Sequence, residues 1–239
     1  MAISRGKVLV RASDFKTSAT DLLALAESRD TEVRARVAAN PNVPGAVLEV
    51  LVKDADETVR AGAAGNPELS LADLSRMVND PSSLVRKRVG ESPHAAPSDL
   101  SHLARDAEWD VREEVARNPN TPAKAALALA YDADKRVRFM AYFHPALDAE
   151  TMVGLAEDVD IAVRCRVAAF GKTPVEVVEK LADDPIPMVR AWAATNRCLS
   201  SETLARLAED SFSVVREAAS SGTVSLESVL PGPSKRLSA

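Results

Sequence analysis

Apolar and polar residues recur along this chain with a period of 26 residues. A valine followed by an arginine marks each repeat, and no insertion interrupts the series. These valines are Val33, Val59, Val85, Val111, Val137, Val163, Val189 and Val215. Four residues after each valine comes another Val or Ala, which places both side chains on one face of a helix. The pattern predicts a short helix in every repeat, over about residues 31–39 in the first.

A second apolar pair follows in each repeat and predicts a second short helix. In the first repeat this pair is Leu48 and Leu51, and in the last it is Leu204 and Leu207. An Asn-Pro dipeptide such as the one at Asn40 separates the two patterns in several repeats, and proline stops a helix because the preceding residue avoids the α region. The sequence leaves open whether the second helix is α or 3₁₀. Because one helix pair cannot bury its own apolar face, the repeats must stack into an α-solenoid.

These residues resemble a known family. The segment Glu108–Pro122 looks like the leucine-rich repeat variant, a relative of HEAT-like α-solenoids. The residues that carry the resemblance are Val111, Arg112, Val115, Ala116, Asn118, Pro119 and Pro122. It implies an all-α fold, a right-handed α-solenoid of about eight 26-residue two-helix repeats, and it implies no chemistry. Some members hold an iron–sulfur centre in an N-terminal cysteine cluster. The cysteines here are Cys165 and Cys198, so we expect no cofactor and no metal site.

Composition and charge divide the chain into three parts. Residues 1–19 are interpreted as a basic N-terminal extension, residues 20–230 as the solenoid with a capping helix over 19–27, and residues 231–239 as a disordered basic tail. The whole chain has a formal net charge of −5, so the repeats carry the acidic balance. Two cysteines fit a reducing compartment, and no apolar run reaches the ~20 residues of a membrane span. We therefore expect a cytoplasmic protein that does not contact membranes.

Each repeat ends on an aspartate that lies six residues before the next Val-Arg arginine. We predict a structural ladder of ion pairs from this spacing. Its members are Asp54 with Arg60, Asp80 with Arg86, Asp106 with Arg112, Asp132 with Arg138, Asp158 with Arg164, Asp184 with Arg190, and Asp210 with Arg216. An arginine column can also follow a nucleic-acid backbone, but the acidic repeats disfavour that interpretation. The Asn column is interpreted as a turn, in which the side chain caps its own backbone.

Repeats 5–7 depart from the pattern. Positions opposite the valine face should be exposed and polar, yet here they are Phe139, Met140, Phe143, Cys165, Ala169, Met188 and Trp192, with Arg166 among them. We predict an exposed apolar patch that binds a protein or peptide partner through Phe139, Met140, Phe143, Arg166, Met188 and Trp192. Two other roles remain open: a cover formed by Val224–Leu230, and a homodimer contact. A helical phase wrong by one position would instead bury some of these side chains.

No group of residues in the sequence points to catalysis. The histidines are scattered, and neither a Gly-rich phosphate loop nor a nucleophile elbow occurs. We expect a binding scaffold that is not an enzyme. The alternative is a DNA-binding HEAT-like protein of the glycosylase kind, for which Trp109, Asp110 and Trp192 are the only candidates. A third interpretation is an enzyme that modifies a prosthetic group or a partner, as some HEAT-like lyases do, and no residues support it.

Overall fold

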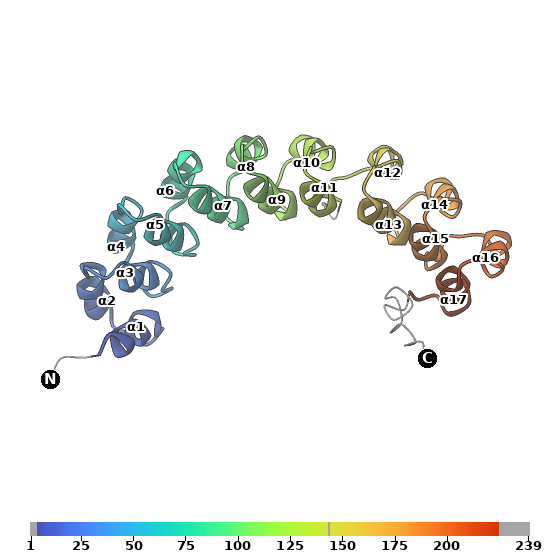
Figure 1. Cartoon of the computed structure of the whole chain (residues 1–239). Helices are drawn as coiled ribbons and strands as arrows, with labels where there is room; N and C mark the ends of the chain where they lie inside the picture. Colours follow the sequence, from blue (N-terminus) through green and yellow to red (C-terminus); the bar gives the residue numbers. More distant parts are fainter. Residues whose placement is uncertain (1–3, 143, 225–239) are drawn as a thin grey trace, which may run out of the picture. The chain divides into compact units, whose positions relative to one another are not determined.

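The protein is built from short helices that pack in pairs. The computed structural model describes residues 4–142 and 144–224, and no strand occurs in these ranges. The chain divides into two compact units, residues 1–129 and residues 130–239, which are described separately. Within each unit, the odd-numbered helices form one layer and the even-numbered helices form the other (Figure 1). The predicted all-α solenoid of repeated helix pairs is confirmed.

Unit 1 contains the first half of the repeats. Its first layer consists of α1 (Arg5–Ser13), α3 (Thr31–Ala38), α5 (Glu57–Ala64), α7 (Ser83–Glu91) and α9 (Trp109–Arg117). Its second layer consists of α2 (Ala19–Ala26), α4 (Gly45–Leu51), α6 (Leu71–Arg76), α8 (Pro97–Leu103) and α10 (Ala123–Ala130), which reaches the unit boundary. A 3₁₀ turn, η1 (Met77–Asn79), extends α6. The second helix of each repeat is thus mainly α-helical, which the sequence left open.

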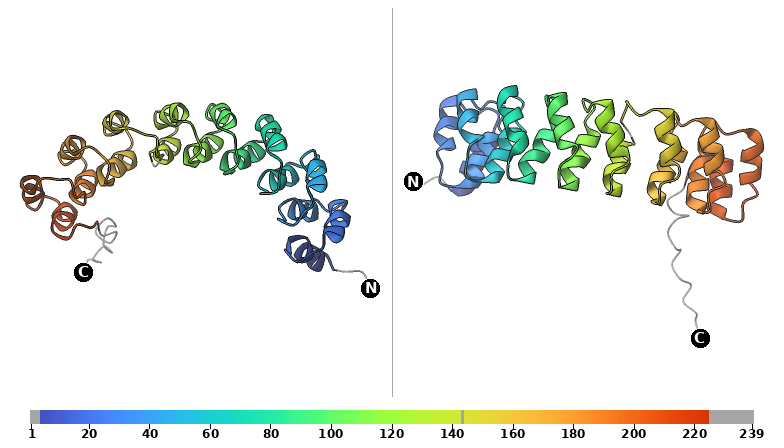
Figure 2. Two further views of the ribbon diagram at one scale, coloured as in Figure 1. Left: turned by 180° about the vertical axis from the view of Figure 1, so that it is seen from behind. Right: turned by 90° about the horizontal axis from the view of Figure 1, so that it is seen from above.

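Unit 2 repeats the same arrangement. One layer consists of α11 (Lys135–Ala141), α13 (Ile161–Ala169), α15 (Pro187–Ala194) and α17 (Ser213–Ser221), and the other of α12 (Ala149–Leu155), α14 (Val175–Leu181) and α16 (Ser201–Leu207). The helices within a layer lie side by side, as Figure 2 shows. The layer that contains α13 and α15 lies on the inner side of the bend of this unit (Figure 1).

Short polar side chains begin most of these helices. Asp30 accepts a hydrogen bond from the backbone N–H of Glu32, and the same cap recurs across the repeats. The other aspartates that cap odd helices in this way are Asp56, Asp134 and Asp160. Ser82 precedes α7 without a side-chain cap bond. Each cap satisfies one of the backbone donors that a helix start leaves open, which matters for helices of only two turns.

The core lies between the two layers and consists of the predicted apolar columns. Val33, Val59 and the equivalent valines of all later repeats are at most 1% exposed. The second apolar pair, which begins at Leu48 and Leu51, is at most 5% exposed through Leu181, and in the last repeat Leu207 is buried while Leu204 is half-buried. Because every repeat supplies the same four positions, each layer of side chains packs on the next and the core is continuous within a unit.

The predicted N-terminal extension is not outside the repeat fold. Residues 5–13 form α1, which packs against α3 as the first helix of a repeat would. Ala12 is fully buried there, and Leu22 of α2 is fully buried as well. These two residues lie 26 positions before Ala38 and Leu48, although the Val-Arg pair itself is missing at this point. The helix pairs therefore begin at Arg5, and α1 with α2 covers the N-terminal end of unit 1. The predicted tail, residues 231–239, lies outside the described residues.

Candidate functional site

Six of the Val-Arg arginines each hold a carboxylate and a carbonyl at once. In each of them, Nε and Nη2 donate to both oxygens of the aspartate 20 residues later, with Nε to Oδ2 distances of 2.5–2.8 Å. These pairs are Arg34 with Asp54, Arg60 with Asp80, Arg86 with Asp106, Arg138 with Asp158, Arg164 with Asp184, and Arg190 with Asp210. Such bidentate pairing fixes both orientation and distance between consecutive loops.

This geometry corrects the predicted pairing. The aspartate six residues before each arginine contributes its backbone carbonyl, not its carboxylate: Nη1 of Arg60 donates to the carbonyl oxygen of Asp54 at 2.9 Å. Arg112 and Arg216 make the same bond to the carbonyls of Asp106 and Asp210. The carboxylate lies instead at the end of the arginine's own repeat. The sequence shows both aspartates at a fixed spacing and cannot distinguish which one offers its side chain.

The ladder is a structural device rather than a phosphate-binding surface. The paired arginine side chains are only 11–18% exposed. Hydrogen bonds from Arg34 hold the pKa of Asp54 below its usual range. Burial alone would raise the pKa of Asp80, but hydrogen bonds from Arg60 and from the backbone N–H of Ser82 outweigh it and lower the pKa. The guanidinium groups are thus already engaged with carboxylates, which disfavours the nucleic-acid interpretation of this column.

The asparagine column links consecutive repeats. Nδ2 of Asn66 donates to two carbonyls of the preceding repeat, those of Ala38 at 2.7 Å and Asn40 at 2.9 Å. Its Oδ1 accepts from the backbone N–H of Glu68, which is the turn expected from the sequence. The same two donor bonds are made by Asn40, Asn118 and Asn196, all nearly fully buried. The side chain therefore satisfies buried backbone groups on both sides of the junction.

Unit 2 replaces this link by an aromatic pair at one junction. Phe170 stands in the asparagine position, and its ring packs edge-on against Tyr142 with centroids 5.0 Å apart. Tyr142 is 1% exposed and occupies a position that is small in the other repeats, such as Ala168. Burial raises the pKa of Tyr142 well above its usual value. The junction between α11 and α13 is therefore built differently from the junctions that keep asparagine.

A second difference at this junction concerns the contact between neighbouring odd helices. In unit 1, Gly62 lies so close to α3 that a Cβ atom would be 2.8 Å from the carbonyl oxygen of Ala35. In unit 2, the equivalent residues are Arg166 and Phe139, and Cζ of Arg166 lies 5.1 Å from the ring centroid of Phe139. Large side chains thus stand where small ones allow close approach, and α13 packs more closely on α15 than on α11.

A groove of about 610 Å³ runs over this junction, on the layer formed by α11, α13 and α15. Residues from three consecutive repeats line it. They are Lys135, Phe139, Val159, Asp160, Ile161, Ala162, Cys165, Arg166, Met188 and Trp192. The groove lies wholly within unit 2, and its lining combines aromatic, aliphatic and cationic side chains. This is the composition found at the centre of protein interfaces.

The groove brings together four of the six residues predicted to bind a partner, but not as an exposed patch. Phe139, Arg166, Met188 and Trp192 line it and are each half-buried. Met140 is half-buried and is not among the lining residues, and Phe143 lies outside the described residues. Cys165, expected on the outward face, is buried. These positions point sideways toward the neighbouring odd helix, as Gly62 does toward Ala35, so their apolar atoms are partly covered.

Two apolar residues that the sequence analysis did not single out are more exposed than these. Val159 is 90% exposed and Ile161 is 43% exposed, and both border the groove. Val159 lies between two aspartates of the loop before α13, where the repeat places polar or small residues such as Ala55 and Ala133. A large apolar residue at this loop position, where other repeats have small or polar ones, is the sequence signal that marks the site.

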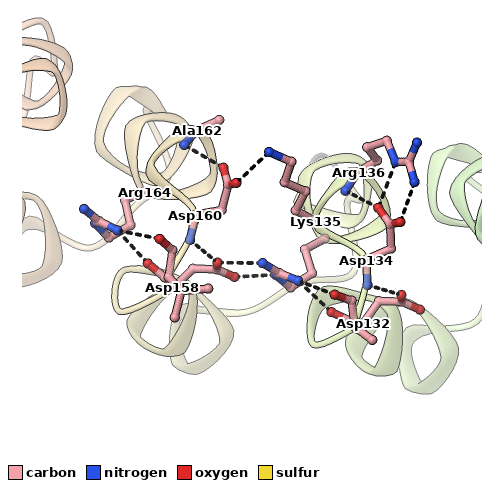
Figure 3. Close-up of polar contacts among 11 residues, drawn as sticks. Asp132, Asp134, Lys135, Arg136, Asp158, Asp160, Ala162 and Arg164 are labelled. Carbon is pink, nitrogen blue, oxygen red and sulfur yellow. Dashed lines mark hydrogen bonds and ion pairs between the residues drawn. The ribbon is translucent and has the colours of Figure 1, made fainter.

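The polar end of the groove is formed by Lys135 and Asp160, whose contacts with neighbouring charged side chains are drawn in Figure 3. Nζ of Lys135 lies 3.2 Å from a carboxylate oxygen of Asp160, and Arg136 donates to Asp134 at 2.6 Å. Both aspartates also cap helices, since they accept from the backbone N–H groups of Arg136 and Ala162. Burial would raise the pKa of Asp160, but the hydrogen bonds from Lys135 and the backbone of Ala162 lower it. This carboxylate therefore stays ionised, and both of its oxygens are engaged.

The described residues contain no cluster of potential metal ligands. No group of three or more His, Cys, Asp or Glu side chains in these ranges is arranged to hold a metal ion. The DNA-binding candidates are divided between the units: Trp109 and Asp110 begin α9, with Asp110 3.9 Å from Lys87, whereas Trp192 lies on α15. Among the described helices, none combines the length and the apolar character needed to cross a membrane.

The fold and its recurring links define an all-α solenoid assembled from repeated helix pairs. The model of the family "Leucine rich repeat variant" matches residues 109–134, which comprise α9, the Asn-Pro turn and α10. The solved structure of a leucine-rich repeat variant with a novel repetitive structural motif is 24% identical, with a TM-score of 0.73, over 93% of this chain and 88% of that one. One repeat of the chain thus matches the leucine-rich repeat variant model, and the fold resembles that of a leucine-rich repeat variant, as the sequence implied.

A more distant structural neighbour shares the helical fold. The Escherichia coli protein YibA is 14% identical over 93% of this chain and 97% of that chain, with a TM-score of 0.53. No curated protein matches the sequence. These similarities concern the architecture alone, so a function must be argued from the surface of this chain itself.

Proposed function

We propose that this protein is a non-catalytic scaffold that binds a segment of another protein in the groove on α11, α13 and α15. The observation that carries the proposal is the junction between α11 and α13. There Phe139 and Arg166 stand in the positions that Ala35 and Gly62 hold in unit 1, and a groove lined by three repeats lies over the junction. An apolar groove that includes Trp and Met at its floor and an exposed Val159 at its edge is suited to bury side chains of a partner.

Within this proposal, Trp192 and Met188 accept the apolar side chains of the partner and Arg166 contributes hydrogen-bond donors beside Phe139. Trp192 is the largest apolar residue of the groove and is already half-buried within the protein. An aromatic side chain that the protein already holds in place loses little conformational freedom when a partner binds. Met140 and Phe143 complete the predicted set of partner-binding residues on α11 and just beyond it.

The experiment is selection of a phage-displayed library of random linear peptides on the immobilised full chain. We expect enriched peptides whose affinity falls by about 2 kcal/mol, or roughly thirtyfold, in Trp192→Ala. Because Trp192 also packs within the protein, Val159→Asp provides a second variant at a side chain that is 90% exposed. Its matched control is Val153→Asp, which introduces the same charge at an exposed position of α12 in the other layer.

Three results would contradict the proposal. The first is a selection that yields no peptide whose binding depends on Val159 or Trp192. The second is equal loss of binding in Val153→Asp and Val159→Asp. The third comes from light scattering: wild-type dimers that become monomers in Val159→Asp would assign the groove to a second copy of this chain.

A further inference from the structure

The charged side chains at the polar end of the groove do not face solvent equally. The side chains of Lys135 and Arg136 are 67% and 50% exposed, whereas those of Asp160 and Asp134 are 18% and 21% exposed. The carboxylates are enclosed because they cap α13 and α11 and accept hydrogen bonds from the two cations. Solvent, and any partner, therefore meets ammonium and guanidinium groups first.

This cationic end adjoins the apolar part of the groove directly. Lys135 and Asp160 belong both to the apolar groove and to a second depression of about 490 Å³, which extends over Arg136 and Arg138. Arg166 adds a further guanidinium group between Phe139 and the apolar floor. A cation stacked on a ring interacts through its flat face, and its N–H groups point along the edge, where a planar carboxylate can bind them.

The chain as a whole carries a net charge of −5, so this local excess of exposed cations runs against its overall charge. Charge complementarity decides among possible occupants. The tail of this chain, residues 231–239, contains Lys235 and Arg236 and no acidic residue, so its charge does not complement the cationic end. The cover predicted from Val224–Leu230 carries one acidic residue, Glu227, and beyond Val224 it lies outside the described residues. A nucleic-acid backbone offers phosphates to the cations but no apolar side chain to the part of the groove lined by Met188 and Trp192. An acidic and apolar peptide matches both parts of the groove.

Building on the proposed function, we propose that the occupant is a linear segment of a partner protein in which acidic residues adjoin one or two large apolar residues. The apolar residues lie on Met188 and Trp192. The carboxylates bind Lys135, Arg136 and Arg166 at the other end. The apolar contact supplies the larger part of the affinity, and the charges supply orientation, selectivity and rate of association.

The test uses the phage-displayed peptides selected on the full wild-type chain. We expect Asp and Glu to be enriched next to large apolar residues, relative to the unselected library. Synthetic copies of these peptides should bind the double variant Lys135→Gln, Arg136→Gln roughly three- to tenfold more weakly, with the difference largest at low salt. The matched control is Lys180→Gln, Arg206→Gln, which removes two exposed cations from α14 and α16 in the other layer.

Failure of this inference differs from failure of the proposed function. Peptides that need Trp192 but show no excess of acidic residues, or bind both double variants equally, would overturn the acidic occupant and leave the scaffold in place. Absence of any Val159- or Trp192-dependent peptide would remove both. Duplex DNA that bound the wild type and was released by the Lys135→Gln, Arg136→Gln variant would assign the cationic end to nucleic acid and overturn the inference.

Discussion

The guanidinium of Arg166 lies over the ring of Phe139, with 5.1 Å between Cζ and the ring centroid. Gly62 and Ala35 hold the same two positions in unit 1, where the helices approach so closely that no Cβ fits at Gly62 without displacement of backbone. The same two positions are thus small at one junction, where the helices are in close contact, and large at the other, over which the groove lies. Side-chain size at these positions does not by itself set the spacing, because Lys87 and Glu114 hold them between α7 and α9, which pack as closely as α13 and α15.

Substitution of Gly62 tests how closely α3 and α5 must approach. Replacing glycine by alanine within a helix usually stabilises it by about 0.5–1 kcal/mol. Here we expect Gly62→Ala to lower the free energy of unfolding by roughly 1–3 kcal/mol, because the new Cβ meets the carbonyl oxygen of Ala35. Urea unfolding measures the change. Gly45→Ala is the control, since nothing lies within 4 Å of that Cβ position, and a stabilised Gly62→Ala protein would contradict the account.

The ladder arginines should contribute far more to stability than exposed ones. Arg60 and Asp80 are 13% and 9% exposed, so Arg60→Ala leaves a carboxylate in a largely buried site. We expect Arg60→Ala to lower the free energy of unfolding by about 2–4 kcal/mol. Arg60→Lys should restore only part of this loss, because lysine keeps the charge but cannot form the bidentate pair. Arg76 pairs with Asp73 but is 75% exposed, so Arg76→Ala should cost less than about 1 kcal/mol. Equal losses at the two arginines would show that the ladder does not stabilise the fold.

The same carboxylates predict the dependence of stability on pH. The pKa values of Asp54, Asp80, Asp106 and Asp210 are lower in the folded protein than their usual value. Such groups stabilise the fold above the unfolded pKa of about 4, and this contribution is lost as the pH falls through the folded pKa. We expect the free energy of unfolding to fall steeply below about pH 4. The gap between wild type and Asp80→Asn should narrow over that range, and a gap that stayed constant would refute the assignment.

The asparagine link can be removed without changing the shape of the side chain. Asn66→Asp keeps the oxygen that accepts from Glu68 but replaces the donor to Ala38 and Asn40 by a charged acceptor. We expect a loss of about 2–4 kcal/mol at neutral pH, because two buried carbonyls lose their partner and face a carboxylate. Asn79→Asp at an exposed position is the control. Similar urea midpoints for the two variants would show that the link carries no energy.

The two cysteines should differ in reactivity. Burial raises the pKa of Cys165 to about 11, and its side chain lies at the floor of the groove. Cys198 is exposed. Because the thiolate is the reactive form, iodoacetamide at pH 8 should modify Cys198 at least about tenfold faster, as measured by mass spectrometry of timed samples. Equal rates would mean that the groove opens to its floor in solution.

The repeat columns were predictable because every repeat places a given position in the same environment. A side chain such as Val111 is buried by the same neighbours as Val85, so the period alone identifies the core. The first helix of the N-terminal pair escaped detection because α1 keeps Ala12 in register but carries its Val-Arg dipeptide, Val10-Arg11, three residues out of register. The second helix was predicted as a capping helix over 19–27, and its Leu22 is in register with Leu48, so that single column would have extended the array.

The site was harder to predict, because it depends on contacts between repeats. A helical wheel gives the face that meets the second layer, but it does not show that neighbouring odd helices lie side by side. Phe139 and Arg166 therefore counted as outward residues, although they face each other across a junction. The pairing of Asp54 with Arg34 rather than Arg60 escaped for the same reason. Arg34 and Arg60 both lie at a fixed spacing from Asp54, and only the path of the chain in three dimensions shows which of them pairs with its carboxylate.

The links that join the repeats also constrain how the chain can change in length. A paired ladder arginine contacts a carbonyl six residues before it and a carboxylate 20 residues after it, as Arg60 does with Asp54 and Asp80. Both contacts lie within one copy of the pattern and its immediate neighbour. A gene that duplicates or deletes a whole 26-residue segment therefore preserves every link, whereas the gain or loss of one residue in a loop breaks two of them. Such an array can evolve in length only by entire repeats.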